Sequence, residues 1–249
     1  YTYIQNPMKV LLVRHGESAN NAMFKHLEKT RPNDTREQLL EEWRKQRSED
    51  PQLTIQGVEQ GKQVSQFYSN ILHGQNVFVY SSPTLRGLQT AEQFVKYIKI
   101  AEPVNVLDTL YERDGIYHTY RNVISNSKKE LETMFPQFNY SLLKQGSWYK
   151  LDHKETPEEA EERSRRIVNT WLLSDSFINQ HMNDVVVLIV HRELMSLILE
   201  AFVNGKSNIS FFHDNTATSL INVQSKDDIE IKWVNRFDHI DMSQSRAFL

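Results

Sequence analysis

The sequence has 249 residues, 39% hydrophobic and 24% charged, a balance typical of a globular α/β protein with a sizeable core. Its net charge of -3 at pH 7 gives no general attraction to nucleic acid. The absence of cysteine excludes disulfides, thiolate catalysis and cysteine-based zinc sites. No apolar run reaches the roughly 18 residues of a membrane span, and residues 1–8 lack a signal-peptide pattern. We therefore expect one cytoplasmic domain over residues 1–249 that binds neither nucleic acid nor membrane.

An apolar run over Val10–Val13 is too short and too β-branched for a helix, and it predicts a buried strand of a parallel sheet. Arg14 and His15 follow at its carboxyl end, the edge where open α/β sheets bind ligands. Gly16 is expected to allow a sharp turn and the close approach of a ligand. Glu17-Ser18 suits the first turn of a helix. An arginine and an imidazole beside a helix amino end together favour a phosphate group.

Residues 22–52 form a polar, charged stretch that we interpret as a helical insertion. Thr35 is expected to cap a short helix there, with Gln38 completing a capping box. The apolar side of this helix comprises Leu39, Leu40 and Trp43. We expect the helix to pack over or near the site. Two interpretations stay open at this point, a solvated surface excursion and a lid or specificity element.

Thr54 is expected to be the N-cap of a long helix that Gly74 ends. The core face of this helix comprises Val64, Phe67, Tyr68 and Ile71. Val77–Tyr80 then predicts a second buried strand, and Ser81–Ala91 joins it to another helix. Arg86 falls in the first turns of that helix, near the carboxyl edge of the sheet, where a guanidinium offers paired donors to phosphate oxygens. The core face of the second helix comprises Leu88, Ala91, Val95 and Ile98.

Val104–Leu107 predicts a third strand, and the stretch that follows it carries Glu112. A carboxylic acid held near a bound phosphate can protonate a departing alkoxide, because burial and neighbouring negative charge raise its pKa. Arg113 is expected either to contact the substrate or to form an ion pair with Asp114. Residues 116–153 are irregular in pattern. Unranked candidates for substrate contact in this region are Tyr117, His118, Tyr120, Arg121 and Lys150.

Thr156 and Pro157 begin a predicted helix with a capping box. Its inward residues are Ala160, Ile167, Val168 and Trp171, and the charged run Glu158–Glu162 is expected to be a solvated face. Val185–Val190 is the strongest strand pattern of the sequence, continuous and β-branched, and it ends at His191.

The residues after His191 predict a further helix and a pair of strands. The apolar face of the helix comprises Leu194, Leu197, Ile198, Ala201 and Phe202. Asn215–Leu220 leads into one strand and Ile229–Val234 forms another, which predicts an antiparallel hairpin at the edge of the sheet.

Four of these stretches, taken in order, resemble the histidine phosphatase superfamily, the clan of cofactor-dependent phosphoglycerate mutases and fructose-2,6-bisphosphatases. The matching residues are Arg14-His15-Gly16-Glu17-Ser18 with Asn21, the block from Ser82 through Arg86 to Thr90-Ala91, Leu110-Tyr111-Glu112-Arg113, and His191 after its strand. The resemblance covers most of residues 9–223. It implies a three-layer α/β/α sandwich with a mostly parallel central sheet, and a variable substrate-pocket region at about 116–153.

The resemblance also implies roles for individual residues. His15 is then the nucleophile that forms a phosphohistidine, and His191 flanks the phosphoryl group on the opposite side. Glu112 takes the position of the acid. The phosphate-binding positions are Arg14, Asn21 and Arg86, to which Arg192 could add a third guanidinium. No metal and no cofactor are implied.

The sequence departs from the family pattern at two places. Arg192-Glu193 follows the second histidine, where members carry glycine or aspartate, so Arg192 could also block the pocket and Glu193 is a rival proton donor. The tryptophan-rich segment of the mutases is absent, which argues against a phosphoglycerate mutase. We therefore expect a metal-independent phosphatase for a small phosphorylated substrate or a phosphoprotein. The alternatives are a mutase and a catalytically weak phosphate-binding or scaffold protein, and an edge strand could support a homodimer.

Overall fold

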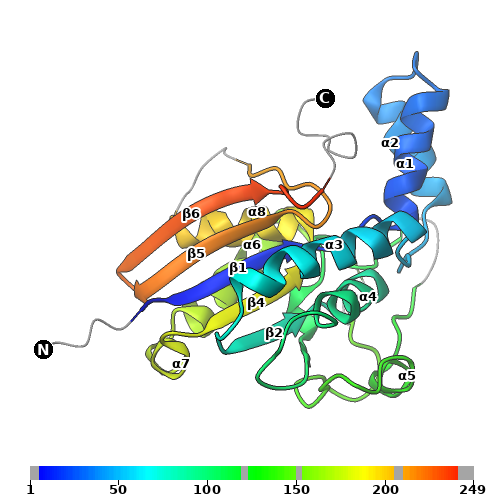
Figure 1. The fold of residues 1–249 in the computed structure, drawn as a ribbon. Coiled ribbons are helices and arrows are strands. Elements are labelled where there is room, and N and C mark those ends of the chain that lie inside the picture. Colours follow the sequence, from blue (N-terminus) through cyan, green and yellow to red (C-terminus); the bar gives the residue numbers. More distant parts are fainter. Residues whose placement is uncertain (1–5, 119–122, 150–152, 205–209, 241–249) are drawn as a thin grey trace, which may run out of the picture.

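The computed structural model describes residues 6–118, 123–149, 153–204 and 210–240 (Figure 1). The candidate residues Tyr120, Arg121 and Lys150 lie outside these ranges. The described strands form one sheet in the order β3-β2-β4-β1-β5-β6. None of the helices in the described ranges is both long enough and apolar enough to cross a membrane.

The centre of the sheet is the parallel pair β1 (Met8–Arg14) and β4 (Val185–Val190), with Arg14 opposite Val190. β2 (Val77–Ser81) runs parallel on the other side of β4, and β3 (Asn105–Val106) pairs with β2. The predicted third strand is therefore shorter than Val104–Leu107. The expected antiparallel edge hairpin is confirmed as β5 (Thr218–Ser225) and β6 (Asp228–Arg236), which pairs with β1 through β5.

Helices cover both faces of the sheet (Figure 1). α3 (Ile55–Ile71) and α4 (Leu85–Phe94) pack on one face, where their apolar residues join Leu11 and Val13 in one core. The other face carries α6 (Pro157–Arg165), the π-type segment η2 (Arg166–Leu172), α7 (Asp175–His181) and α8 (Arg192–Phe202). Val10 and Leu12 point into this second core. The alternation along β1 confirms a three-layer α/β/α sandwich with a mostly parallel sheet.

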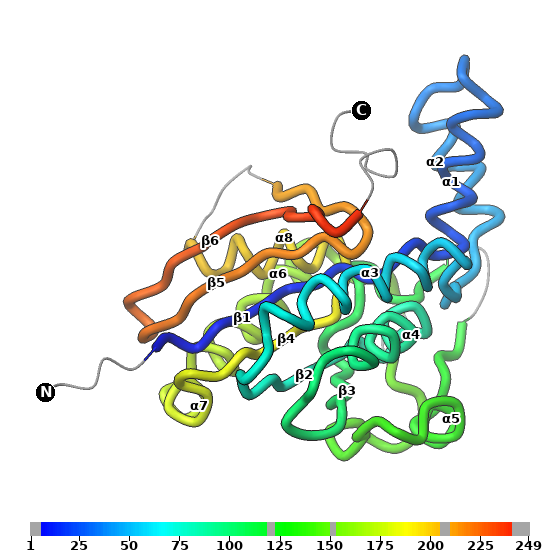
Figure 2. The backbone as a smooth tube through the Cα atoms, in the orientation of Figure 1, coloured from blue at the N-terminus to red at the C-terminus, as the bar shows by residue number. Residues whose placement is uncertain are grey.

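The charged insertion is a pair of helices, α1 (Ala19–Thr30) and α2 (Arg36–Gln46), which project together from the body of the molecule (Figure 2). The predicted capping box of Thr35 and Gln38 is confirmed at the start of α2. The helix expected to begin at Glu17-Ser18 is confirmed as α1, which Ser18 caps with Asn21 completing a second capping box, and it continues through the first half of the stretch. α2 packs against α1, and Trp43 Nε1 of α2 donates to the carbonyl of Asn20 at 3.0 Å, next to the candidate residue Asn21.

Three further boundaries differ from the sequence pattern. The helix predicted to run through Ile98 ends at Phe94, although Ile98 stays buried outside it. Residues 116–153 contain a short helix, α5 (Lys128–Met134), which Ser127 caps. The helix that Thr156 caps changes to π-type turns at Arg166. Ile98, Leu131 and Ile167 are buried, while Val95 and Trp171 are only partly buried, and the end of each element depends on local hydrogen bonds.

Candidate active site

Parallel pairing brings the carboxyl ends of β1, β4 and β2 to one edge of the sheet. Arg14 ends β1 and His15 follows it, while His191 comes directly after β4. The backbone N–H of His15 donates to the carbonyl of Val190 at 3.0 Å, which extends the pairing by one residue. The two histidine rings therefore face each other across this edge, with their centroids 5.0 Å apart.

The hydrogen bonding of His15 defines its tautomer. Its Nδ1 lies 2.6 Å from the carbonyl oxygen of Gly16, so Nδ1 carries the proton and donates it. Burial, together with the charges of Arg86 and Arg14, holds the pKa of His15 well below its ordinary value. The ring is therefore neutral, with Nε2 as its unprotonated nitrogen, which is the form that attacks an electrophile.

His191 is fully buried and has one ring nitrogen to offer a ligand. Its Nε2 lies 2.8 Å from Ser82 Oγ, in the loop after β2. Its Nδ1 is buried and has no hydrogen-bond partner among the described residues. Burial, followed by the charges of Arg86 and His15, lowers the pKa of His191 well below its usual range. A buried polar atom of this kind is one that a bound ligand would satisfy.

Two buried guanidiniums lie beside the histidines. Arg14 Nη1 donates to the carbonyl of His213 at 2.7 Å, and Arg14 Nε is buried without a partner in the described part of the chain. Burial, followed by the charge of Arg192, lowers the pKa of Arg14 to about 10. Burial also lowers the pKa of Arg86, which sits in the first turn of α4. The pair supplies the fixed positive charge that a phosphate requires.

Asp50 was not predicted as a site residue, but it reaches the site from the segment that follows α2. Its Oδ1 accepts a hydrogen bond from the N–H of Leu85 at 3.0 Å and lies 3.6 Å from Arg86 Nη1. Its Oδ2 is buried with no partner among the described residues. Burial raises the pKa of Asp50 to about 6. The insertion thus contributes a carboxylate to the site from the segment after its second helix, and no local pattern singled out Asp50.

Glu112 is held at the amino end of α8. Its Oε1 accepts hydrogen bonds from the N–H groups of Arg113 at 2.9 Å and Leu194 at 3.1 Å, and its Oε2 lies 3.4 Å from the N–H of Glu193. Burial, followed by the charge of Glu193, raises the pKa of Glu112. A buried carboxyl with a raised pKa beside a phosphate site has the properties of a proton donor.

The surroundings of Glu193 differ from those of Glu112. Its side chain is 49% exposed and lies 3.5 Å from Arg113 Nη1. The expected ion pair between Arg113 and Asp114 does not form, because Asp114 pairs with Lys154 at 3.1 Å instead. Adjacent side chains on this loop point in different directions, so neighbours in sequence are not neighbours in space.

The structure places Asn21 in a capping role. Its Oδ1 accepts from the N–H of Ser18 at 3.1 Å, which leaves its amide nitrogen as the group that could meet a ligand. Asn215, which sequence reasoning did not single out, links Asn21 to the site, because its Nδ2 lies 3.1 Å from the His15 carbonyl and 3.3 Å from Asn21 Oδ1. Arg192 starts α8 with its guanidinium over the ring of Phe212, 5.3 Å from the centroid.

Gly16 meets a packing requirement that the sequence pattern did not indicate. A Cβ added there would lie 2.3 Å from the carbonyl oxygen of Gly57, so the glycine is required by close backbone packing against the start of α3. Gly57 has the reciprocal contact, since its Cβ would lie 2.0 Å from the carbonyl oxygen of Glu17. Two glycines therefore lock the loop after His15 onto α3.

No group of three or more histidine, aspartate or glutamate side chains in the described ranges is arranged to hold a metal ion.

Solved structures with the same fold include several phosphatases. The ecdysone phosphate phosphatase of Bombyx mori in complex with tungstate is 16% identical, with a TM-score of 0.64 over 96% of this chain and 97% of that one. A phosphoserine phosphatase mutant of Entamoeba histolytica in complex with phosphoserine is 14% identical, with a TM-score of 0.55 over 94% and 99% of the two chains. YhfR of Bacillus stearothermophilus is 16% identical, with a TM-score of 0.55 over 94% and 100%.

These likenesses show a shared fold. A comparison of the sequence with curated proteins gave no significant match. The sequence profile of the histidine phosphatase superfamily (branch 1) matches residues 10–236, which span the sheet from β1 to β6 and every candidate residue described above. This chain belongs to the histidine phosphatase superfamily.

Proposed function

We propose that the protein is a phosphatase that hydrolyses a phosphomonoester through a phosphohistidine on His15. The observation that carries the proposal is the contact of His15 Nδ1 with the carbonyl of Gly16, which leaves Nε2 as the nucleophilic nitrogen beside two buried arginines. Membership of the histidine phosphatase superfamily supports a phosphatase activity.

In the first step, the lone pair of His15 Nε2 forms a bond to phosphorus while the bond from phosphorus to the ester oxygen breaks. Glu112 gives its proton to the departing oxygen, so the alcohol leaves neutral and Glu112 becomes a carboxylate. In the second step, water attacks phosphorus and returns a proton to Glu112. The N–P bond breaks, and orthophosphate leaves with His15 neutral again.

The charge that develops on the phosphoryl oxygens would be stabilised by Arg14, Arg86 and Nδ1 of His191. These groups are buried and held in place before the substrate arrives, which is the condition under which fixed donors contribute most to a transition state. Two guanidiniums already supply the positive charge that a metal provides in other phosphatases. We therefore propose that hydrolysis proceeds without a metal ion, and that Asn21 and Arg192 assist in binding the substrate.

The test is hydrolysis of p-nitrophenyl phosphate in excess chelator, comparing the wild type with His15→Ala. We expect activity that survives chelation and falls at least about a thousandfold in the variant, since the covalent route is lost. When the reaction with ³²P-labelled substrate is quenched rapidly without acid, ³²P should stay bound to the wild-type protein but not to His15→Ala. Undiminished activity of His15→Ala would overturn the proposed nucleophile.

A panel of phosphorylated metabolites and phosphopeptides would then identify the substrate class. The panel should begin with phosphoserine and ecdysone phosphate, because two structures with the same fold are named as phosphatases of those compounds. Transfer of the phosphoryl group to a second phosphorylated acceptor in place of water would identify a mutase. Phosphate binding without phosphohistidine formation would identify a binding protein. A cytoplasmic location and a homodimer remain our expectations.

A further inference from the structure

The segment that carries Glu112 has little regular structure of its own. It follows the two-residue strand β3 and the single 3-10 turn η1 (Asp108–Leu110), and residues 111–118 form no helix or strand. Hydrogen bonds to the amino end of α8 hold the carboxyl of Glu112, but they act on the side chain alone. The path of the backbone must be set by other contacts.

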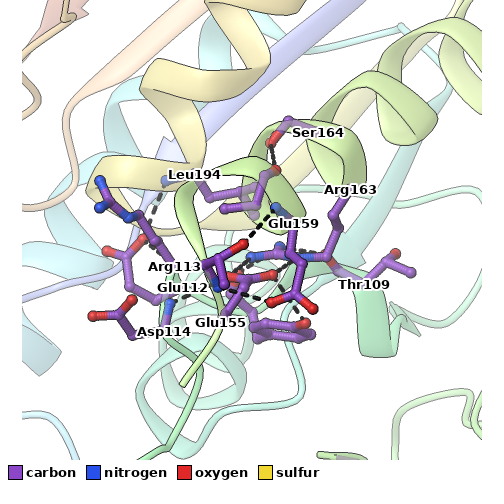
Figure 3. A network of polar contacts seen from close by, with 12 residues as sticks. Thr109, Glu112, Arg113, Asp114, Glu155, Glu159, Arg163, Ser164 and Leu194 are labelled. Atoms are coloured by element: carbon purple, nitrogen blue, oxygen red, sulfur yellow. Dashed lines mark hydrogen bonds and ion pairs between the residues drawn. The ribbon is translucent and has the colours of Figure 1, made fainter. Parts of the chain in front are cut away.

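Behind this segment lies an ion pair that is almost fully buried (Figure 3). Arg163 in α6 donates from Nε to Glu155 Oε1 and from Nη2 to Glu155 Oε2, both at 2.8 Å. The exposed fraction is 5% for the Arg163 side chain and 2% for that of Glu155. This is the bidentate geometry in which arginine and carboxylate bind most specifically.

Each member of the pair also bonds to the backbone on one side of Glu112 (Figure 3). Arg163 Nη1 donates to the carbonyls of Thr109 and Tyr111, both at 2.9 Å. Glu155 Oε2 accepts from the N–H of Asp114 at 3.2 Å. The pair therefore grips the chain on both sides of Glu112.

The ring of Tyr111 strengthens the same grip. Its hydroxyl donates to Glu155 Oε1 at 3.2 Å, and the Arg163 guanidinium lies over the ring at 3.9 Å from the centroid. Tyr111 is the residue immediately before Glu112, so its side chain fixes the backbone from which the acid projects.

Stability alone does not account for this arrangement. Removing two charges from water is costly, and a buried ion pair often contributes no more to stability than apolar residues of the same volume. Apolar residues, however, could not bond to the two carbonyls and the N–H of the loop. The pair fixes the position and orientation of the loop backbone. Such precision matters most for a group whose function depends on a position accurate to a fraction of an ångström.

We infer that Glu155 and Arg163 are positioning residues for proton donation by Glu112, acting through the backbone of residues 109–114. The inference rests on the proposed function. Neither side chain is assigned a contact with the substrate. Their loss should displace Glu112 from the leaving oxygen and leave the phosphoryl-binding groups in place.

Two substrates that differ only in the leaving group separate this effect from general damage. Phenolate from phenyl phosphate needs a proton far more than the weakly basic p-nitrophenolate does, so loss of the acid slows phenyl phosphate more. The quantity to measure is kcat/KM, which includes the step in which the ester bond breaks. For the double variant Glu155→Gln/Arg163→Met we expect kcat/KM to fall about tenfold to a hundredfold on phenyl phosphate, and less than about threefold on p-nitrophenyl phosphate.

The matched control is Glu161→Gln/Arg165→Met, which removes an exposed ion pair of 2.7 Å from the same helix. Its kcat/KM should equal that of the wild type on both substrates. If the buried double variant does not fold, Arg163→Lys is the substitute, because it keeps a cation beside Glu155 but cannot form the same set of hydrogen bonds. Its kcat/KM should again fall more on phenyl phosphate than on p-nitrophenyl phosphate, by a smaller factor than in the double variant. Equal losses on both substrates in a folded variant would overturn the inference.

Glu112→Gln provides the benchmark for both proposals. Its kcat/KM should fall more on phenyl phosphate than on p-nitrophenyl phosphate, and by a larger factor than in the Glu155 and Arg163 variants. If the ratio of kcat/KM for the two substrates in Glu112→Gln equals that of the wild type, Glu112 is not the proton donor. A selective loss in Glu112→Gln, combined with an equal loss in the Glu155 and Arg163 variants, would refute only the positioning role.

Discussion

The two halves of the candidate site are held in place by different kinds of structure. Arg14, His15 and His191 form the sheet half, at the ends of two adjacent strands whose backbones are paired in register. Glu112 forms the loop half, which follows a strand of two residues and one 3-10 turn. The sheet half is positioned by main-chain hydrogen bonds, whereas the loop half depends on Arg163 of α6, on Glu155 just before that helix, and on the amino end of α8.

This difference matters because the halves are proposed to perform different tasks. The sheet half would bind the phosphoryl group, which every substrate shares, and the loop half would donate a proton to a leaving group that varies. Changes in the sheet half should therefore affect all substrates equally, while changes in the loop half should depend on the leaving group. Five predictions extend this comparison, in order of decreasing effect.

Arg86, in the first turn of α4 after β2, would bind the phosphoryl group together with the sheet half, so replacing it should lower activity without regard to the leaving group. For Arg86→Met we expect kcat/KM to fall about 10²–10³-fold on both phenyl phosphate and p-nitrophenyl phosphate, because a buried donor to the phosphoryl oxygens is lost. Replacing Arg86 leaves the carboxylate of Asp50 without its partner, so the double variant Asp50→Asn/Arg86→Met is the control. A loss confined to phenyl phosphate would contradict the division between the halves.

Acid should destabilise the sheet half. Burial lowers the pKa of His213, which holds Arg14, from 6.5 to about 4. Below pH 6.5 the unfolded chain binds a proton at this residue that the folded chain does not bind until about pH 4, so the free energy of unfolding decreases as the pH falls through this range. The contribution is about 3 kcal/mol. Urea unfolding at pH 7 and pH 4 should show a smaller decrease in His213→Gln than in the wild type.

The raised pKa of Glu112 has the opposite effect on how the free energy of unfolding changes with pH. Its contribution to stability is greatest at low pH and is lost as the pH rises through its folded pKa. In urea unfolding at pH 7 and pH 4, Glu112→Gln should therefore show a larger decrease in the free energy of unfolding than the wild type, because it lacks this compensating term. A smaller decrease in Glu112→Gln would contradict the raised pKa.

Removing the charge of Asp50 should strengthen phosphate binding. Asp50 shares Arg86 with the proposed phosphate, and its pKa of about 6 means that it is ionised at pH 7.5. For Asp50→Asn we expect inorganic phosphate to inhibit about three- to tenfold more tightly at that pH, equivalent to about 1 kcal/mol. Near pH 5, where the wild-type carboxyl of Asp50 is protonated, phosphate should inhibit the variant and the wild type equally.

The control for Asp50 is Asp34→Asn, which removes a carboxylate from the tip of the α1–α2 pair. Unchanged inhibition in Asp50→Asn would favour the interpretation of the insertion as a surface excursion.

Glu193→Gln should have the smallest effect. The charge of Glu193 raises the pKa of Glu112, so its removal lowers that pKa and moves the alkaline decline of kcat/KM to lower pH. The displacement should be a fraction of a pH unit because Glu193 is exposed, and activity at pH 6 should stay within about twofold. A large loss selective for phenyl phosphate would instead identify Glu193 as the proton donor.

Much of the fold could be predicted from the sequence because its signals are local. The β-branched run Val185–Val190 matches β4 residue for residue, and the capping boxes at Thr35 and Thr156 begin their helices as expected. The ends of elements were less predictable. α1, for instance, continues through a polar stretch with little apolar periodicity, because capping and its contact with α2 stabilise it.

The sequence by itself determined the residues that stand at the ends of the strands and the family to which the chain belongs, because strand runs and short motifs are patterns between near neighbours. Only the tertiary structure decided what those residues meet. His213 holds Arg14 from 199 positions away, Asp50 pairs with Arg86, and Arg163 grips the backbone beside Glu112. Such contacts arise from the packing of elements, and no periodicity or spacing along the chain encodes them.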